Sequence, residues 1–352
     1  MPVANYEIYC QMLERAREKK YAYPAINVTS LASANAVLKG LAESGSDGII
    51  QVSTGGAAFA SGVSVNDKVM GACSIAEHVH RVAERYNIYV ALNTDHCQAN
   101  VLDEFVVPLI AITEKRRAAG LPNLFNSHMF DGSALSLKEN LDIAVPLFER
   151  CHKSQIILEI EAGVVGGEED GVKGGDAASE KLYTTPEDMA EVARRMNTVK
   201  GAKYMFAATF GNVHGVYKPG HVKLNPSILK QGQEVIKKTL GKGAYFYFVF
   251  HGGSGSSLDE IHEAVDYGVV KMNVDTDAQY AFTRPIADHM LKNYDGVLRV
   301  DAEVGDKKKY DPRVYLKLAE KSMADRVKQA VSDLRGTGTT LCKEKELATA
   351  HS

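Results

Sequence analysis

The stretch AYFYFVFHGGSGSSLDEIHEAVDYGVVKMNVDT, residues 244–276, has the sequence pattern of a strand, a helix and a second strand. Residues 244–252 and 269–276 are short apolar runs of the kind that form buried strands. Residues 257–268 have apolar positions at helical spacing and close on a glycine, as helices often do. Strand, helix and strand in succession predict a parallel sheet with a helix packed on it.

The same alternation extends through the rest of the chain. Helical spacing recurs at 30–45 and 101–120, each time between apolar runs. With the two runs above, the candidate strands number eight; the other six are 21–28, 47–53, 88–96, 124–130, 155–163 and 203–211. A doubly wound open sheet would alternate in the same way, so the strand count alone does not decide the architecture.

Polar residues at the ends of the strands favour a closed barrel. Asp95 and His96 follow the third strand, Glu161 ends the fifth, His251 ends the seventh and Asn273 lies near the end of the eighth. In a barrel these strand ends converge on one face, where barrel enzymes carry their active sites. We therefore predict an α/β protein with the TIM (β/α)8 barrel fold.

The domain organisation follows from the length of 352 residues, which a barrel with insertions can reach as one domain. We expect a single domain over 1–352, with the barrel at about 20–295 and a C-terminal helical extension at about 296–336. Residues 311–336 have the spacing of a terminal helix, which could cap the barrel or join a partner subunit. The insertion at 163–183 is rich in glycine and acidic residues, so we expect a mobile active-site loop, although a plain surface loop fits its composition.

Composition excludes several classes of function. The formal net charge of -3 offers no basic excess for nucleic acid. The five cysteines are scattered and odd in number, which argues against a disulfide framework and favours a reducing, cytoplasmic setting. The first residues are polar and no run of 18 apolar residues occurs, so we expect neither a signal peptide nor a membrane span.

Three histidines follow strands in small-residue or acidic contexts: His96 in TDHC, His214 in GNVHGVY and His251 in FHGGSGS. A single histidine is more often an ordinary core or surface residue than a metal ligand. Three on one face of a barrel favour zinc, because three protein ligands leave a fourth position open for substrate. His128, near the end of the fourth strand, is adequately explained by core packing.

A glycine-rich turn, HGGSGSS at 251–257, and the segment NVDT at 273–276 predict an anion site at the ends of the last two strands. Backbone N–H groups at such a turn, the hydroxyls of Ser254 and Thr276, and the start of a following helix would all attract a phosphate. Barrels often bind phosphate at this position. A turn of this composition elsewhere would be no more than a flexible connection.

Carboxylates complete the candidate chemistry. Asp95 is adjacent to a candidate zinc ligand and is suited to carry a proton at the substrate. Glu168 and Glu169 lie in the glycine-rich insertion, where a carboxylate could move over bound substrate. Asp131 and Glu161 could form a second cation site, although a buried hydrogen-bond network explains them equally well.

Seven separated segments resemble class II fructose-1,6-bisphosphate aldolases, in the same order: PAINVTS, QVSTGG, TDHC, EIEAGVVGGEEDGV, ATFGNVHGVYKPG, FHGGSGS and KMNVDTD. The resemblance runs from about residue 5 to residue 335. It implies a TIM barrel that cleaves fructose 1,6-bisphosphate to dihydroxyacetone phosphate and glyceraldehyde 3-phosphate with zinc. It also implies a homodimer or homotetramer and a small sugar bisphosphate as the partner, and the charge and hydropathy above argue against a nucleic acid or a membrane as a partner.

The resemblance implies a role for each matching residue. Asp95 would be the general acid/base at the C4 hydroxyl, Glu169 would exchange the C3 proton of dihydroxyacetone phosphate, and Asn273 would hold the enediolate. The implied zinc ligands are His96, His214 and His251, and the positions that match a second metal site are Asp131, Glu161 and Glu168. The implied substrate and phosphate contacts are Asn27, Ser53, Gly215, Gly252, Gly253, Ser254, Asp275, Thr276 and, from a neighbouring subunit, Arg313. A monovalent cation, Na+ or K+, would lie near the C1 phosphate.

Several alternatives stay open at the level of sequence. Tagatose 1,6-bisphosphate differs from the fructose substrate only at C4, although the long C-terminal extension with YDPR resembles the fructose branch. A Schiff-base aldolase would need an amine, for which Lys271 is the best candidate, but a lysine that balances nearby carboxylates is the simpler interpretation. A metal-dependent hydrolase would leave the phosphate-binding turn unexplained. A catalytically silent sugar-phosphate-binding protein would not need the full set of catalytic residues.

Overall fold

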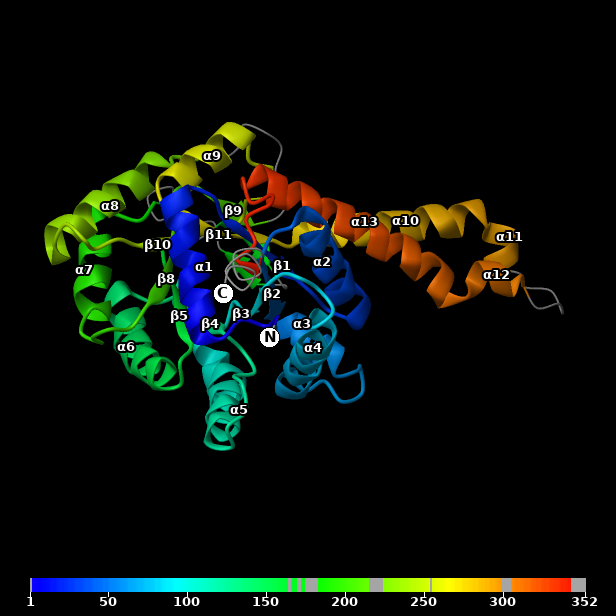
Figure 1. The fold of residues 1–352 in the computed structure, drawn as a ribbon, viewed down its shortest axis with the longest axis horizontal. Coiled ribbons are helices and arrows are strands. Elements are labelled where there is room, and N and C mark those ends of the chain that lie inside the picture. The colour runs from blue at the N-terminus through cyan, green and yellow to red at the C-terminus, as the bar shows by residue number, and fades with distance from the viewer. Residues whose placement is uncertain are drawn as a thin grey trace, which may run out of the picture.

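The computed structural model describes residues 2–163, 166–169, 172–174, 183–214, 224–253, 255–298 and 305–342, with the backbone alone at 166–169, 172–174 and 213–214. Eight parallel strands close into a barrel in the order β1-β11-β10-β8-β5-β4-β3-β2, with helices around them (Figure 1). The strands are β1 Tyr23–Asn27, β2 Gly48–Ser53, β3 Val90–Asp95, β4 Ser127–Asp131, β5 Ile157–Ala162, β8 Tyr204–Ala208, β10 Tyr247–Phe250 and β11 Val269–Val274. Seven of them lie within a predicted strand, β4 extends one residue beyond its predicted range of 124–130, and the predicted TIM barrel is confirmed.

Helices cover the outside of the barrel. They are α2 Leu31–Ser44, α3 Thr54–Ala60, α4 Lys68–Ala83, α5 Val106–Ala118, α6 Leu137–Lys153, α7 Pro186–Met196, α8 Ser227–Leu240 and α9 Leu258–Asp266. Capping boxes begin four of these helices, at Ser30, Ser136, Thr185 and Ser257. The single helix predicted at 101–120 is instead a 3-10 helix, η1 Ala99–Glu104, followed by α5, because the backbone at Phe105 departs from helical geometry.

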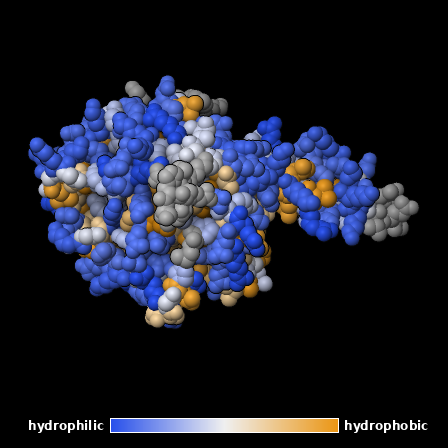
Figure 2. All heavy atoms as spheres, in the orientation of Figure 1, coloured by the Kyte–Doolittle hydropathy of each residue, from blue (hydrophilic) through white to orange (hydrophobic). Residues whose placement is uncertain are grey.

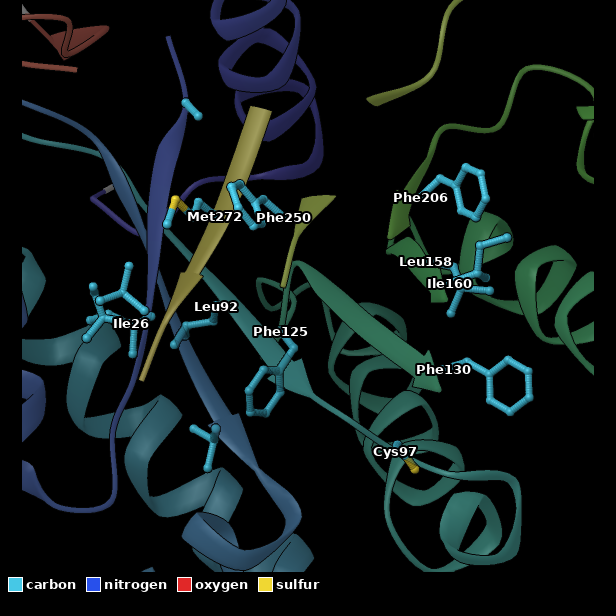
Figure 3. Packing of buried hydrophobic residues seen from close by; sticks show 14 of the residues in the cluster. Ile26, Leu92, Cys97, Phe125, Phe130, Leu158, Ile160, Phe206, Phe250 and Met272 are labelled. Carbon is cyan, nitrogen blue, oxygen red and sulfur yellow. The ribbon is translucent and has the colours of Figure 1, made fainter. Parts of the chain in front are cut away.

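Two apolar layers stabilise the fold. One lies between the barrel and its helices, where outward-facing residues such as Ile26, Leu92, Phe206 and Phe250 are buried (Figure 3). The other is formed by inward-facing strand residues of the barrel, and the helix α1 Tyr6–Lys19 packs against them. Polar side chains replace this inner apolar layer toward the carboxyl ends of the strands, which places the chemistry at that end.

The C-terminal part of the chain forms an arm. Helices α10 Thr276–Lys292 and α13 Pro312–Asp333 pack against each other. The short helices α11 Tyr294–Val297 and α12 Lys307–Tyr310 lie between them in the sequence, and the four helices project from the barrel (Figure 1). The end of α13 packs on α2. Beyond it, the N–H of Ala22 donates to the Leu334 carbonyl at 3.0 Å. The predicted helix at 311–336 is therefore present and serves both as barrel cover and as part of the arm.

The glycine-rich insertion contains regular structure that a loop prediction missed. Strands β6 Gly166–Glu169 and β7 Val172–Gly174 pair in antiparallel fashion, and β6 pairs in parallel with β9 Val213–His214. The other residues of the insertion between 164 and 182 lie outside the described residues. Within the described ranges, no helix combines the length and the apolar character needed to cross a membrane.

Candidate active site

The carboxyl ends of the strands bring the predicted polar residues together. Asp95 is the last residue of β3, and His96 follows it with a φ of 31°, which turns the chain sharply out of the strand. His251 follows β10 and has no exposed surface. Ligand atoms of Asp95, His96 and His251 lie within 4.8 Å of one another, as do those of His96, Asp131 and Glu161.

The two imidazoles are oriented by carboxylates on their far sides. Nδ1 of His96 lies 3.2 Å from Oδ2 of Asp131, and Nε2 of His251 lies 2.8 Å from Oε1 of Glu159. An ionised carboxylate only accepts hydrogen bonds, so these two nitrogens carry the ring hydrogens. Their lone pairs are therefore on Nε2 of His96 and Nδ1 of His251, which lie 2.9 Å apart.

In their neutral forms the two rings direct these lone pairs at each other, which is unfavourable unless a cation lies beside them. Burial lowers the pKa of His251, and the bond to Glu159 opposes this only in part, so the ring is neutral near neutral pH. Histidines that donate one N–H to a carboxylate and present the other nitrogen are typical of zinc sites. The donor set of His96 and His251 therefore fits a divalent metal such as zinc.

Asp95 lies beside this pair and is held at both oxygens. Nδ2 of Asn27 donates to Oδ2 at 2.9 Å, and Nδ2 of Asn273 donates to Oδ1 at 3.1 Å. Asn27 is in turn fixed by Gln51, whose Nε2 donates to its Oδ1 at 2.5 Å. The amides hold the carboxylate in one orientation next to the histidines, where a substrate bound to a metal would lie.

Asn273 connects the carboxylate with the histidines. Its Nδ2 also lies 3.2 Å from Nδ1 of His251, while its Oδ1 is buried and accepts no hydrogen bond from the protein part that the structure describes. A buried amide oxygen without a donor is costly, so a ligand hydroxyl is a natural partner for it. This places Asn273 at the substrate side of the site.

The chain matches the family model described as fructose-bisphosphate aldolase class-II over residues 8–339. A fructose-bisphosphate aldolase of Mycobacterium leprae is 57% identical over 344 residues, which cover 97% of this chain and 99% of that protein. The corresponding protein of Corynebacterium glutamicum is 55% identical over 346 residues, 97% of this chain and 100% of its own length. The chain belongs to the class II fructose-bisphosphate aldolase family.

Structural similarity agrees with this assignment to an aldolase. The crystal structure of a fructose-bisphosphate aldolase from Campylobacter jejuni has a TM-score of 0.83, is 39% identical, and the match covers 96% of each chain. The family is one of lyases, so the predicted enzyme class and the predicted resemblance are confirmed. The fructose branch is favoured over the tagatose alternative by the names of these relatives.

Asp131 and Glu161 lie close to His96 and His251 and already interact with neighbouring protein groups. Oδ1 of Asp131 accepts from the N–H of Ser133 at 3.0 Å and from its hydroxyl. Burial alone would raise the pKa of Asp131, but its bonds to His96 and Ser133 outweigh this and keep it below its ordinary value. Oε2 of Glu161 lies 3.8 Å from Nδ1 of His251. Both residues stay candidates for a second metal position.

The predicted phosphate face is only partly described. Gly252 has a φ of 61°, a left-handed conformation that favours glycine, and a Cβ added to Gly253 would meet Cε of Met272 at 2.2 Å, so the end of that flexible side chain would have to move. Thr276 begins α10, and the carboxylate of Asp275 just before it accepts from Gln279. Gly215 and Ser254 lie outside the described residues.

Three further predicted residues are described by backbone alone. Glu168 and Glu169 lie on β6, and His214 lies on β9, where it is paired with Gly167. The pairing of β6 with β9 links the glutamates to the segment of the third histidine. Their predicted roles stay predictions.

Ser53 and Arg313 have local partners. Oγ of Ser53 accepts from the N–H of Gly56 and so caps α3. Arg313 is in the first turn of α13, on the arm, where it pairs with Asp311 and its side chain is 80% exposed. Figure 1 shows the start of α13 far from the barrel strands, so this arginine does not join the site of its own chain.

The structure adds one site residue that sequence reasoning did not assign, Glu159, and identifies it as the partner of Lys271. Oε2 of Glu159 accepts from Nζ of Lys271 at 2.7 Å, and both side chains are fully buried. The predicted alternative of a lysine balancing a carboxylate is the arrangement observed. Alternation in ILEIEA could have signalled Glu159, because it must face the same side of β5 as Glu161.

Proposed function

We propose that this chain catalyses the reversible, zinc-dependent cleavage of fructose 1,6-bisphosphate to dihydroxyacetone phosphate and glyceraldehyde 3-phosphate, in glycolysis and gluconeogenesis. The observation that carries the proposal is the placement of Asp95 beside two imidazoles with converging lone pairs. Such a group can move a proton at the hydroxyl whose carbon is released. A bound metal would lie next to it.

Zinc, held by His96, His251 and, by the family pattern, His214, would act as a Lewis acid on the substrate oxygens and stabilise negative charge that develops on them. Asp95 accepts the C4 hydroxyl proton as the C3–C4 bond breaks. The amides of Asn27 and Asn273 donate to its two oxygens and leave little freedom for the carboxylate to turn away. Proton transfer by a residue held in this way contributes about 10²–10⁴-fold in rate.

Asn273 faces the part of the substrate that becomes negative. Its Nδ2 is directed toward Asp95 and His251, while its Oδ1 is left for a substrate hydroxyl. By the family pattern, Glu169 returns a proton to C3 and so completes dihydroxyacetone phosphate. Asp131, Glu161 and Glu168 would offer a second metal position.

The phosphates would bind at opposite ends of the substrate. Asn27, Ser53, Gly215 and the turn with Gly252, Gly253 and Ser254 would contact the substrate and, together with Asp275 and Thr276, hold the C1 phosphate, with a Na+ or K+ ion nearby. Support comes from Gly252 and Gly253, since neither carries a Cβ beside the backbone N–H groups at the strand end.

A homodimer or homotetramer would supply the contact to the other phosphate. Arg313 lies on the projecting arm, where it is exposed. The arm also carries exposed apolar side chains, and Figure 2 shows hydrophobic atoms gathered on it. They are Tyr280, Leu291, Tyr294, Leu298, Val314 and Leu318. Apolar surface on a projection that cannot fold onto its own barrel supports contact with a second copy of the chain.

The proposed compartment is the cytoplasm. Cys10, Cys73, Cys97 and Cys151 have free thiols, and Cys97 and Cys151 are buried. Free thiols in this number suit a reducing environment.

The decisive assay compares fructose 1,6-bisphosphate with tagatose 1,6-bisphosphate on purified protein, before and after chelation and with zinc restored. Cleavage that is lost on chelation, recovered with zinc and faster with the fructose substrate is the expected result. Activity that resists chelation and is trapped by borohydride would instead indicate a Schiff base at Lys271. Zinc binding without turnover would leave a silent sugar-phosphate binder.

A further inference from the structure

Three buried side chains in contact connect the interior of the barrel to the proposed metal site. Nζ of Lys271 lies 2.7 Å from Oε2 of Glu159, and Oε1 of Glu159 lies 2.8 Å from Nε2 of His251. The side chains of all three residues have no exposed surface. They come from β11, β5 and the end of β10, so the contact crosses the interior of the barrel.

The lysine and the glutamate are buried in the interior of the barrel, where neither side chain has exposed surface. Below them, the barrel is filled by residues such as Tyr9, Met205 and Val249. Charges buried at this depth cost free energy unless they are paired and further bonded. Here the glutamate is bonded at both oxygens, once to a cation and once to the ring that faces the metal site.

The two oxygens of Glu159 therefore bind different partners. Lys271 donates to one and holds the carboxylate in place, while the other accepts the N–H of His251 and fixes which ring nitrogen carries the hydrogen. If the ring were held by a mobile acceptor, either nitrogen could face the site. Only the tautomer with hydrogen on Nε2 presents a lone pair on Nδ1 toward His96.

We propose that Lys271 is a positioning residue that acts through Glu159 to fix the tautomer and orientation of His251, and so prepares Nδ1 to bind the metal. The inference rests on the proposed function, since it requires a metal at His96 and His251. It assigns Lys271 no contact with substrate and no covalent chemistry. It also explains why a lysine lies deeper along β11 than Asn273, two residues closer to the start of the strand.

The pairing of opposite charges supports this role. Nζ of Lys271 lies 2.7 Å from Oε2 of Glu159 and both side chains are fully buried, so the ammonium group favours the ionised carboxylate. An ionised carboxylate only accepts hydrogen bonds, so it accepts the N–H of the ring. Removal of Lys271 would leave this carboxylate buried without a cation and without the bond that orients it.

The test is Lys271→Met, with Lys203→Met as a matched control. Lys203 also donates to a side chain, Oη of Tyr247 at 3.0 Å, and lies 3.8 Å from Glu14, but it is at the opposite end of the barrel. We expect Lys271→Met to weaken zinc binding by about 10–100-fold, as changes behind a ligating histidine do. The control should retain parent affinity in the same competition against a chelator.

A second readout separates positioning from simple loss of stability. In protein labelled with 15N in histidine, the metal-free parent should show hydrogen on Nε2 of His251, and Lys271→Met should show a mixture of tautomers. The visible spectrum of the cobalt-substituted protein should change in the same variant. A role limited to stability would lower the melting temperature but leave the affinity, the nitrogen signals and the cobalt spectrum of folded protein unchanged, and this result would overturn the proposal.

The double variant Glu159→Gln/Lys271→Met covers the case in which the single variant does not fold, because it removes both buried charges. We expect it to fold and still to bind zinc more weakly than the parent, since its amide is no longer anchored. Parent affinity in the folded double variant would also overturn the inference. Failure of the parent protein to bind zinc would instead overturn the proposed function, so the two failures are distinguishable.

Discussion

Nε2 of His96 lies 2.9 Å from Nδ1 of His251, and the two rings meet edge to face at 88°. The residues are 155 positions apart in the chain, and they follow β3 and β10 in the closed barrel. Asp131 and Glu159 lie on their far sides and set the hydrogens so that the lone pairs converge. The barrel thus brings together two histidines from segments far apart in the sequence, in a geometry that suits a shared metal ion.

Asp95→Asn tests the proton-transfer role. The variant keeps the shape of the side chain but removes the basic oxygen, so kcat should fall by about 10²–10⁴-fold while zinc stays bound. Turnover and zinc content are measured on the same preparation. Asp103→Asn, at an exposed position of η1, is the matched control and should retain full activity. Near-parent turnover by Asp95→Asn with full zinc occupancy would remove this residue from the role.

Leu291→Glu tests the arm as an interface between copies. This leucine is 78% exposed on α10, so a charge there disturbs little within one chain but would be buried in an oligomer. Sedimentation should show a shift toward monomer, and KM for the bisphosphate should rise because Arg313 could no longer reach a neighbouring site. Leu121→Glu, at a leucine 52% exposed away from the arm, should change neither. An unchanged oligomer in Leu291→Glu would argue against this surface.

Much of the fold could be predicted because the strands of the barrel are buried on both faces. Strands such as β8 and β10 are therefore short, continuous apolar runs, and all eight strands were recognisable. The antiparallel pair β6 and β7 was not, because glycine and acidic residues give no strand signal. The break at Phe105 was hidden by helical spacing on both sides.

The site could be predicted only in part, for a different reason. Asp95, His96 and His251 stand at strand ends, where a barrel collects chemistry. The partners behind them depend on contacts across the barrel that no local pattern contains. Glu159 and Lys271 are 112 positions apart, and although alternation places Glu159 on the same side of β5 as Glu161, nothing local shows that it pairs with Lys271. The roles expected for Gly215 and Ser254 stay predictions.

Gly40→Ala tests the packing of the last helix on the barrel. A Cβ at Gly40 of α2 would lie 2.6 Å from the carbonyl oxygen of Ala324 and 2.7 Å from Cβ of Val327, both on α13. The helices must separate, which should lower the free energy of unfolding by about 1–3 kcal/mol in urea titrations. Gly243→Ala is the matched control, because its added Cβ meets nothing within 4 Å. Equal stability of the two variants would show that α13 adjusts without cost.

Glu14→Gln tests the attachment of α1 to the barrel. The Glu14 carboxylate accepts from Oη of Tyr245 at 2.5 Å and Oη of Tyr247 at 2.6 Å and also pairs with Arg17. Burial alone would raise its pKa, but these partners lower it from 4.5 to about 2. Because the folded pKa is below the unfolded one, the stabilisation is complete above about pH 5 and is lost as the pH falls toward 2.

Glu14→Gln should therefore lower the free energy of unfolding by about 1–2 kcal/mol near neutral pH, a value reduced by the partial exposure of the group. The difference from the parent should shrink as the pH falls from about 5 toward 2, because the parent carboxylate is then progressively protonated in both states. Urea unfolding at several pH values measures this. Glu149→Gln, at an exposed position of α6, is the control and should follow the parent throughout. A deficit in Glu14→Gln that stays constant with pH would mean that shape, and not the charge of Glu14, holds α1 in place.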